Sequence, residues 1–490
     1  MSNMGSFING KWFMPSSKKR IHNVNPASLD EVVADFPAAS SEDALRAIEA
    51  AEAAYSGWSS VPAPERGRYI ARAATIARQR LDEIARMITL EEGKILPEAK
   101  GETLKGINVL EFFAGEGFRI QGSTFPSEVP NTTAYTIRQP LGPVGVISPW
   151  NFPWAIPCWK IAPALVAGNT VVFKPASLTP LTAAILIEIL DEAGLPPGVC
   201  NMVVGSGSDV GNTIVKHPGI KAISFTGSNE VGVALYVEAS RRLAKVTCEM
   251  GGKNPLVVLD DADIDKAVKA IIGSAFGSTG QRCTATSRLI VQPSVKKTLL
   301  DILVDKAESM KVGNGMMPDI EMGPAVDRSQ LETDLGYCEI AKSEGAKLLV
   351  GGCLDTSAGN GHFIRPTIFD CVTPDMRLFQ EEVFGPVLAV TEAKDFDEAL
   401  RLANNSRYGL TSAIFTNDFV FSQRFINEIH SGMTHINEPT IGGEAQLPFG
   451  GIRATGVGDR EMSQIGLNFF TEIKTVFVNY APTGERSMIR

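Results

Sequence analysis

Short apolar segments alternate with helical segments through the middle of the chain, and this alternation restricts the fold more than any other feature. The apolar segments are LGPVGVISPW, TVVFKPAS, VCNMVVG, KAISFTG and KVTCEMGG. Helical patterns of about a dozen residues separate them, which is the sequence form of a parallel, doubly wound α/β sheet. Ligands of such sheets bind at the carboxyl ends of the strands, so functional residues are expected there.

A second series of strands and helices follows, and the change falls near residues 249–254. A length of 490 residues exceeds what one ordinary core accommodates, so we expect two doubly wound α/β domains. Before them, an Ala-rich helical block starts at Ser41 and continues to about Gly122 as packing material. The last apolar stretch, FFTEIKTVFVNYAP, is β-branched and aromatic, and predicts a strand that pairs outside its own domain.

The composition excludes several classes of function. A net charge of −9 has the wrong sign for a nucleic-acid surface, which needs a basic stripe. The first residues show no signal-peptide pattern and no window approaches about 18 continuous apolar residues, so we expect no export, no membrane span and a cytoplasmic location. The five histidines form no HxxxH or HExxH pattern and the seven cysteines form no CxxC, so we expect no metal site and reduced thiols.

The stretch FGSTGQRCTATS, residues 276–287, marks Cys283 as the candidate nucleophile. A lone cysteine is usually a small buried hydrophobic residue, and this is our interpretation of the other six. At Cys283, a Gly-Gln-Arg approach predicts a tight turn with an adjacent cation, Arg282, and small hydroxyl residues leave space around the sulfur. A thiolate beside positive charge has a lowered pKa and is nucleophilic.

The candidate base is a carboxylate, because none of the histidines lies in a motif typical of a thiol protease. Glu249 lies in CEMGGKNP, where a strand meets a turn and two glycines let other backbone approach closely. An isolated Glu is usually a solvated surface residue. Cys248, Met250 and the glycine pair are unlike the neighbours of a charged face, and favour the functional interpretation.

Other segments could bind a phosphate group or an oxyanion. FTGSNEVG, residues 225–232, ends a strand and begins a helix whose free N–H groups can bind a pyrophosphate, and the alternative is a plain N-cap at Ser228. The Gly-rich segment 205–211 is weaker, because its spacing is not GxGxxG. Asn151 in PWNFP is either an oxyanion donor or an ordinary turn residue. Lys174 in VVFKPAS reaches a ribose or phosphate, or is solvated.

Together these residues resemble the motifs of the aldehyde dehydrogenase superfamily, and the resemblance covers essentially the whole chain. The motifs stand in family order and at family spacing, which makes the match specific. They are PWNFP with Asn151, VVFKPAS with Lys174, FTGSNEVG, EMGGKNP with Glu249, GQRC with Cys283, EEVFGPV with Glu382 and Phe384, and PFGGIRATGVGDRE.

The resemblance implies three structural parts. A Rossmann-like coenzyme domain would comprise residues 1–121 and 141–249, and a catalytic domain residues 250–469. An oligomerisation element would join residues 122–140 with residues 470–490 and pair sheets between subunits. A homodimer or homotetramer is implied.

The resemblance also implies the chemistry, which is oxidation of an aldehyde to a carboxylate with NAD or NADP. Cys283 would attack the aldehyde carbonyl, the Asn151 amide and the Cys283 backbone N–H would hold the oxyanion, and hydride transfer would leave a thioester. Glu249 would then activate water for hydrolysis, with Glu461 as an auxiliary carboxylate behind it. Family members that pass the acyl group to coenzyme A generally lack this Glu, so release of a free carboxylate is favoured.

The same motifs imply the remaining site residues. Lys174 would lie at the adenosine ribose, Ser228 at the pyrophosphate, and Glu382 with Phe384 at the nicotinamide. The expected cofactor residues are Ser148, Pro149, Trp150, Lys174, Ser177, Gly211, Thr226, Gly227, Ser228, Val231, Gly251, Glu382 and Phe384. The expected substrate residues are Phe152, Trp159, Arg282, Thr284 and Phe449.

Ser177 bears on the choice between NAD and NADP. Many NAD-preferring relatives have a Glu three residues after the Lys of the KPA motif, where it binds the 2′-hydroxyl and repels a 2′-phosphate. This chain has Ser177 at that position, which removes the repulsion and adds a hydrogen-bond donor. We expect that the protein accepts NADP. A stronger form of this prediction is that it prefers NADP to NAD.

The substrate is less constrained. Trp159 stands where succinic semialdehyde enzymes often have an Arg that grips the distal carboxylate, so that clamp is absent. Arg282 has three open roles, which are to bind an anionic tail, to lower the thiol pKa, or to stabilise its loop. GQRCTA and WAIPCWKIAPAL are most similar to the α-ketoglutaric semialdehyde group. We expect an acidic semialdehyde such as 2,5-dioxopentanoate or succinic semialdehyde; broad aliphatic or aromatic aldehydes and non-phosphorylating glyceraldehyde-3-phosphate oxidation are alternatives.

Two other classes of function are weaker. A non-catalytic family member kept as a structural protein would have lost its nucleophile or base, and both Cys283 and Glu249 are present. A thiol hydrolase would need a histidine motif, which the sequence does not show.

Overall fold

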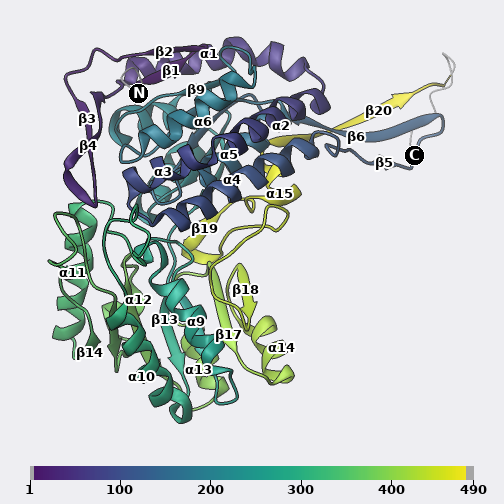
Figure 1. Cartoon of the computed structure of the whole chain (residues 1–490). Coiled ribbons are helices and arrows are strands. Elements are labelled where there is room, and N and C mark those ends of the chain that lie inside the picture. The colour runs from purple at the N-terminus through teal and green to yellow at the C-terminus, as the bar shows by residue number, and fades with distance from the viewer. Residues whose placement is uncertain (1–4, 482–490) are drawn as a thin grey trace.

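The computed structural model describes residues 5–481. Residues 1–4, within the predicted coenzyme domain, and residues 482–490, within the predicted oligomerisation element, lie outside the described residues. Figure 1 shows two α/β bodies, one mostly in the purple and blue of the first half and one mostly in green, with a long arm pointing away from them. The predicted α/β class with two doubly wound sheets and a β element is confirmed.

The first sheet has the doubly wound order that the alternation predicted, β19-β11-β10-β7-β8-β9-β1-β2. Its strands are β1 (Ser6–Ile8), β2 (Lys11–Phe13), β7 (Pro143–Ile147), β8 (Thr170–Lys174), β9 (Cys200–Met202), β10 (Ala222–Thr226), β11 (Lys245–Glu249) and β19 (Gly456–Val457). The chain runs from β7 to β8 and β9, then returns to the other side of β7 for β10 and β11, all in parallel. The direction of winding therefore reverses between β7 and β10.

Helices cover both faces of this sheet. Val171 and Phe173 of β8 pack in one core with α2, α4, α5 and α6, whereas Val172 packs in another with α1, α7 and α8, because successive strand residues point to opposite faces. α5 is buried along its whole length, as its continuous apolar sequence predicts. The helices are α1 (Ser41–Ser60), α2 (Ala63–Gln79), α3 (Leu81–Glu92), α4 (Leu96–Glu116), α5 (Ala155–Ala167), α6 (Pro180–Glu192), η1 (Gly207–Gly211), α7 (Asn212–Lys216) and α8 (Asn229–Ser240).

The second sheet has the order β14-β15-β16-β13-β12-β17-β18, with β14 antiparallel at one edge and the other strands parallel. Its strands are β12 (Asn254–Val258), β13 (Thr286–Val291), β14 (Lys347–Val350), β15 (Thr367–Asp370), β16 (Val387–Glu392), β17 (Thr411–Phe415) and β18 (Met433–Ile436). Its helices are α9 (Ile264–Ala275), η2 (Gly277–Gly280), α10 (Pro293–Ser309), α11 (Arg328–Ser343), α12 (Arg377–Gln380), α13 (Phe396–Asn404) and α14 (Phe419–Glu428).

The arm in Figure 1 is an antiparallel sheet of β5 (Thr124–Phe125), β6 (Thr132–Pro140) and β20 (Thr471–Asn479), in the order β20-β6-β5. β20 pairs with β6 along its length, from Thr471 opposite Pro140 to Asn479 opposite Thr132. The strand predicted from the last apolar stretch is confirmed. A separate hairpin of β3 (Arg20–Asn25) and β4 (Ser28–Pro37) lies near the N-terminus.

The chain crosses back to the first sheet after the second is complete. β19 pairs antiparallel with β11, with Gly456 opposite Glu249, and follows the short η3 (Arg453–Thr455). α15 (Ser463–Phe469) then packs against α5. This return was not anticipated from the sequence, and it brings residues 449–461 beside the candidate base. The domain boundaries inferred from the resemblance stay a prediction.

Candidate active site

The switch point of the first sheet lies between β7 and β10. The two strands pair in parallel, with Ile147 opposite Phe225 at their carboxyl ends. β7 continues into the turn of residues 148–151, and β10 continues into residues 226–228. Open α/β sheets bind ligands where the winding reverses. The predicted motifs PWNFP and FTGSNEVG therefore meet at one crevice.

A cavity of about 300 Å³ lies at this point. Four of its lining residues, Ile156, Met250, Gln330 and Val383, had no signal in the sequence that distinguished them from core or surface residues. Such a concave site with a few converging polar groups is the form expected of a ligand site. Its other lining residues were all predicted: Pro149, Trp150, Asn151, Thr226, Gly227, Ser228, Gly251, Cys283, Glu382 and Phe384.

Cys283 and Asn151 line the same cavity, and hydrogen bonds fix the backbone around both. The Cys283 carbonyl oxygen accepts from Asn254 Nδ2 at 2.8 Å. Asn151 Nδ2 donates to the Gln281 carbonyl oxygen at 3.0 Å. The thiol-bearing turn is thereby tied to β12 and to the turn after β7. A thiol and an amide donor facing one space is the arrangement that attack on a carbonyl and oxyanion stabilisation require.

The loop before Cys283 has a strained backbone. Ser278, Thr279 and Gly280 are consecutive in the left-handed region, with φ of 49°, 58° and 68°, and only glycine adopts it without steric cost. The Ser278 N–H donates to Glu98 Oε1 at 2.8 Å, and the Thr279 hydroxyl donates to the Gly323 carbonyl at 3.0 Å. Strain of this kind persists where surrounding contacts determine it, as these two hydrogen bonds do for the loop that leads to Cys283.

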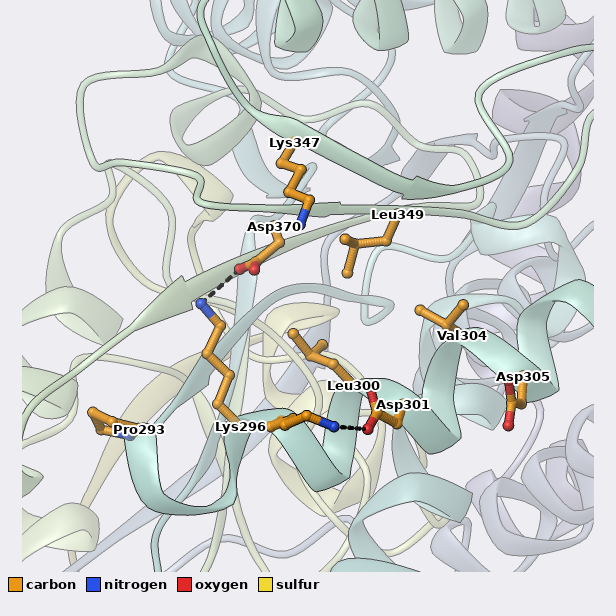
Figure 2. A pocket seen from close by; sticks show the side chains of 10 residues that line it. Pro293, Lys296, Leu300, Asp301, Val304, Asp305, Lys347, Leu349 and Asp370 are labelled. Carbon is orange, nitrogen blue, oxygen red and sulfur yellow. Dashed lines mark hydrogen bonds and ion pairs between the residues drawn. The ribbon is translucent and has the colours of Figure 1, made fainter.

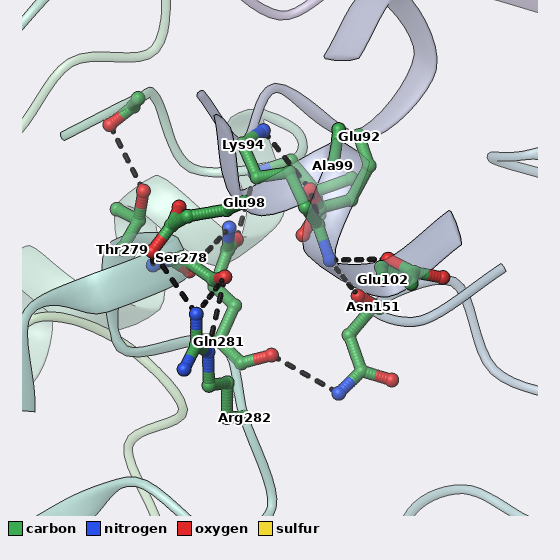
Figure 3. Close-up of polar contacts among 12 residues, drawn as sticks. Glu92, Lys94, Glu98, Ala99, Glu102, Asn151, Ser278, Thr279, Gln281 and Arg282 are labelled. Atoms are coloured by element: carbon green, nitrogen blue, oxygen red, sulfur yellow. Dashed lines mark hydrogen bonds and ion pairs between the residues drawn. The ribbon is translucent and has the colours of Figure 1, made fainter. Parts of the chain in front are cut away.

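Arg282 belongs to the same loop contacts, as Figure 3 shows. Its guanidinium forms an ion pair with Glu98 at 3.0 Å and donates to the Ser278 hydroxyl at 3.0 and 2.8 Å. Glu98 lies on α4, so this pair fastens the loop to the helical block. Of the three roles left open by the sequence, these contacts favour stabilisation of the loop.

The expectation that the Cys283 thiol has a lowered pKa is wrong for this structure. Burial raises its pKa to about 12, and the nearby carboxyls of Glu382 and Glu249 act in the same direction. Lys105 is the cation that opposes them. Sequence adjacency to Arg282 was misleading because the guanidinium is engaged by Glu98.

Glu249 ends β11 and is buried beside the Gly450–Gly451 backbone. Its Oε2 accepts from the Gly451 N–H at 3.2 Å, and a Cβ on Gly450 would lie 2.2 Å from its Oε1. Burial raises its pKa well above the ordinary value, and Glu461 raises it further. A carboxyl with a raised pKa is a stronger base near neutral pH. Glu461 is itself held by Lys160 and by Trp159 Nε1, the latter at 2.8 Å.

A buried ion pair positions the Asn151 turn (Figure 3). Lys94 Nζ donates to the Asn151 carbonyl oxygen at 2.7 Å and pairs with Glu102 at 2.7 Å. The other oxygen of Glu102 accepts from the N–H groups of Trp154 at 2.9 Å and Ala155 at 3.2 Å, the first N–H groups of α5. A carboxylate is stabilised at a helix N-terminus. This network had no sequence signal beyond helical periodicity.

The predicted nicotinamide residues Glu382 and Phe384 lie at the cavity with Gly251 and Trp150. Glu382 Oε1 accepts from the Gly252 N–H at 2.9 Å, and a Cβ on Gly251 would lie 1.8 Å from its Oε2. Trp150 and Phe384 meet edge to face with ring centroids 5.5 Å apart. The absence of a side chain at Gly251 thus lets the Glu382 carboxylate lie directly against the backbone of residues 251–252.

The predicted adenosine residues gather at the end of β8, outside the cavity wall. A Cβ on Gly211 would lie 3.7 Å from Lys174 Cδ, and Ser177 Oγ donates to the Gly205 carbonyl oxygen at 3.3 Å. Burial lowers the pKa of Lys174 to about 8. Ser148 lies beside Lys174, since its N–H donates to the Lys174 carbonyl at 3.2 Å.

Ser228 is the N-cap of α8, and its hydroxyl accepts from the Val231 N–H at 3.4 Å. The plain cap that the sequence left as an alternative is therefore present. It does not exclude a pyrophosphate, because other N–H groups of the first turn have no helical partner. The cavity and the residues at β8 together fit a dinucleotide lying across the switch point.

The predicted substrate residues divide into two groups. Trp159 and Phe449 lie together, with ring centroids 5.5 Å apart. Phe152 lies between Lys94 and Arg282, 3.9 and 5.9 Å from its ring centroid. The Thr284 carbonyl accepts from the Thr440 hydroxyl at 2.7 Å and so belongs to the backing of the loop.

Lys105 is a residue that sequence reasoning missed. Its Nζ lies 5.1 Å from the Trp159 ring centroid and 5.8 Å from that of Phe449. It comes from the middle of α4, where a lysine at helical spacing is indistinguishable from a solvated one.

A larger hollow of about 690 Å³ lies between α10 and the β14–β15 edge (Figure 2). Two of its three lysines are paired, Lys296 with Asp370 at 2.8 Å and Lys297 with Asp301 at 2.7 Å, and Lys347 lines it as well. The residues that line it offer no nucleophile, so we do not assign the site there. In the described part of the chain, no helix is long and apolar enough to cross a membrane, and no group of three or more metal-ligating side chains gathers.

The model of the "Aldehyde dehydrogenase family" matches residues 12–476 of this chain. The chain belongs to the aldehyde dehydrogenase family. It is 46% identical to the α-ketoglutaric semialdehyde dehydrogenase of Bacillus subtilis over 96% of this chain and 97% of the relative. It is 45% identical to the 2,5-dioxopentanoate dehydrogenase of Saccharolobus solfataricus over 95% and 98%.

A solved structure of betaine aldehyde dehydrogenase from Staphylococcus aureus in complex with NAD+ is similar over 98% of this chain and 95% of that chain. The TM-score is 0.95 at 35% identity. The family resemblance drawn from the motifs is therefore confirmed, and NAD(P) is the cofactor class that the family and this complex support.

The Arg282–Glu98 pair gives a first prediction. Arg282→Met leaves Glu98 without its cation and loosens the strained loop, so kcat/KM falls by about the same factor for acidic and neutral aldehydes, and the free energy of unfolding falls by about 2 kcal/mol. Steady-state kinetics with one aldehyde of each kind and urea unfolding measure the two effects.

Glu98→Gln and the double variant serve as the matched controls. Because the two residues act as a pair, the double variant loses less stability than the sum of the single variants. A loss of activity confined to the acidic aldehyde would contradict the loop role and restore substrate binding by Arg282.

Proposed function

We propose that this protein oxidises an acidic semialdehyde, such as 2,5-dioxopentanoate or succinic semialdehyde, to the free carboxylate with NAD(P). The observation that carries the proposal is the shared cavity, in which the Cys283 thiol and the Asn151 amide stand beside the predicted nicotinamide residues. The substrate class is supported by the relatives at 46% and 45% identity, whose names specify α-ketoglutaric semialdehyde and 2,5-dioxopentanoate.

In the first half-reaction, Cys283 gives its proton to solvent water, and its sulfur bonds to the aldehyde carbon as the carbonyl π pair moves to oxygen. The carbonyl oxygen becomes an oxyanion, which the Asn151 amide and the Cys283 backbone N–H stabilise. A bound nicotinamide would supply the hydride acceptor that converts the thiohemiacetal into a thioester. In the free protein, burial raises the pKa of the Cys283 thiol, and Lys105 favours its ionised form.

In the second half-reaction, Glu249 takes a proton from water, and the resulting hydroxide attacks the thioester carbon. The carbon–sulfur bond breaks, the carboxylate leaves, and the thiol is regenerated. Glu249 is suited to this step because burial and Glu461 raise its pKa, while the Gly451 N–H holds its carboxyl in place. Its presence favours hydrolysis over transfer to coenzyme A.

Three finer proposals accompany this one. The protein accepts NADP, and prefers it in the stronger form of the proposal, because Ser177 beside Gly205 places no negative charge near a 2′-phosphate.

The protein forms a homodimer or homotetramer through the arm, where Ile473 and Phe477 are 56% and 71% exposed on a sheet edge. It works in the cytoplasm, which the free state of all seven cysteines supports.

Glu249→Gln tests the hydrolytic step. The amide keeps the shape of the carboxyl but cannot accept a proton, so one equivalent of NAD(P)H per Cys283 forms rapidly and steady-state turnover falls about 100-fold or more. Rapid-mixing absorbance at the NAD(P)H band measures both phases, with exposed Glu192→Gln as the control.

The pH profile sharpens the same test. Because the pKa of Glu249 is raised, its base form appears only as pH rises, so wild-type deacylation increases with pH and this limb disappears in Glu249→Gln. Undiminished turnover in the variant would assign the base to another residue.

Ser177→Glu tests the cofactor proposal. The added carboxylate repels a 2′-phosphate and hydrogen-bonds a 2′-hydroxyl, so kcat/KM for NADP falls about tenfold or more while that for NAD is held or rises. Ser177→Ala, which removes only the hydroxyl, separates repulsion from the lost hydrogen bond. If wild type favours NAD and Ser177→Glu leaves the ratio unchanged, position 177 does not select the cofactor.

A further inference from the structure

Lys105 extends from α4 toward the aromatic pair at the substrate side of the site. Its ammonium lies within 6 Å of two ring centroids, 5.1 Å from Trp159 and 5.8 Å from Phe449. A Cβ on Gly443 would lie 3.4 Å from Nζ, so the loop before Phe449 also borders it. Three segments far apart in the sequence therefore meet at this one cation.

The ammonium lacks a negative partner within the described residues 5–481. No ion pair or hydrogen bond is formed by Lys105 there, although the side chain is half-buried. The neighbouring carboxylates are already neutralised, Glu102 by Lys94 at 2.7 Å and Glu461 by Lys160. Burial lowers the pKa of Lys105, and Arg282 acts in the same direction, while Cys283 and Glu102 oppose them. A half-buried, unpaired ammonium is costly unless a ligand supplies the counter-charge.

The aromatic pair indicates which ligand charge the site accepts. Indole and phenyl faces attract cations, and such faces hold quaternary ammonium ligands in other proteins. Here the faces of Trp159 and Phe449 already have the chain's own ammonium beside them. A cationic aldehyde would meet Lys105 with like charge, whereas an anionic one would meet it with opposite charge.

Lys105 is also coupled to the nucleophile. It is the cation that favours ionisation of the Cys283 thiol, and the thiol in turn acts on Lys105. Cys283 also packs against the buried cluster that contains Trp159 and Phe449, the two rings beside which the Lys105 ammonium lies. A substrate whose aldehyde carbon is at Cys283 therefore extends its far end toward Lys105.

We propose that Lys105, held between Trp159 and Phe449, binds the distal carboxylate of an acidic semialdehyde and selects it over neutral and cationic aldehydes. This inference rests on the proposed function, and it names the residue that makes the enzyme select acidic semialdehydes. Lys105 takes the carboxylate-binding role that Arg282 cannot fill, because the Arg282 guanidinium pairs with Glu98. It also stands in for the Arg that this chain lacks at position 159, where it has Trp159.

The kinetic test compares 2,5-dioxopentanoate with pentanal, which has the same chain length and no carboxylate. Lys105→Met keeps the apolar stem and removes the charge. The ratio of kcat/KM values, acidic over neutral, falls about 10- to 100-fold, chiefly through KM of the acidic aldehyde. Any effect of Lys105 on the thiol alters both aldehydes alike and cancels in this ratio.

Two control variants test whether the effect depends on the positive charge at position 105. Lys105→Arg keeps the charge and retains most of the preference for the acidic aldehyde. Lys100→Met removes a lysine one turn away on α4 that pairs with exposed Asp82 at 2.8 Å, and leaves the ratio unchanged. Equal losses for both aldehydes in Lys105→Met would overturn the proposal and leave Lys105 as a group that acts on the thiol alone.

A binding measurement separates this inference from the proposed function. Glutarate, an unreactive five-carbon dicarboxylate, slows alkylation of Cys283 by iodoacetamide in wild type and not in Lys105→Met, as peptide mass spectrometry quantifies. Protection in a protein that oxidises no aldehyde would sustain the carboxylate site and overturn the function. The opposite result is that the protein oxidises 2,5-dioxopentanoate, glutarate does not protect Cys283, and Lys105→Met leaves the ratio of kcat/KM values unchanged. That result would sustain the proposed function and overturn the role of Lys105.

Discussion

One face of α4 carries Glu98, Glu102 and Lys105, and the site depends on it. The spacing of four and then three residues places these side chains above one another on a helix. Glu98 fastens the strained loop that bears Cys283, and Glu102 with Lys94 fixes the turn that bears Asn151. Lys105 reaches the rings of Trp159 and Phe449. A single helix thus fixes the candidate nucleophile, the candidate oxyanion donor and the proposed carboxylate site relative to one another.

The first sheet adds the second constraint, which is the reversal of winding between β7 and β10. It leaves a crevice whose walls are two strand-end turns, and the second sheet contributes Cys283 and the Glu382–Phe384 segment to the same cavity. The return of the chain as β19 packs Gly450 and Gly451 against Glu249. The candidate base is thereby buried beside this backbone, and burial and Glu461 raise its pKa.

The sequence predicted most of what lies at strand ends and little of what lies on helix faces. Asn151, Glu249 and Cys283 stand in turns whose glycines, prolines and small residues differ from a solvated surface, so the sequence singled them out, and their catalytic roles stay a prediction. Glu98, Glu102 and Lys105 share the periodicity of any amphipathic helix, and that block was interpreted as packing material. Of the three roles left open for Arg282, the sequence could not choose, because adjacency in sequence does not give direction in space, and only the contacts with Glu98 and Ser278 favour the loop role.

The most direct test of the account is the covalent state of Cys283 during turnover. Protein mixed with 2,5-dioxopentanoate and NADP+, quenched with acid within milliseconds and digested, is analysed by mass spectrometry. The account predicts the acyl group of the aldehyde, as a thioester, on the peptide that contains Cys283, in step with NADPH formation. NADPH formation with this peptide unmodified, or with the acyl group on another cysteine, would contradict it.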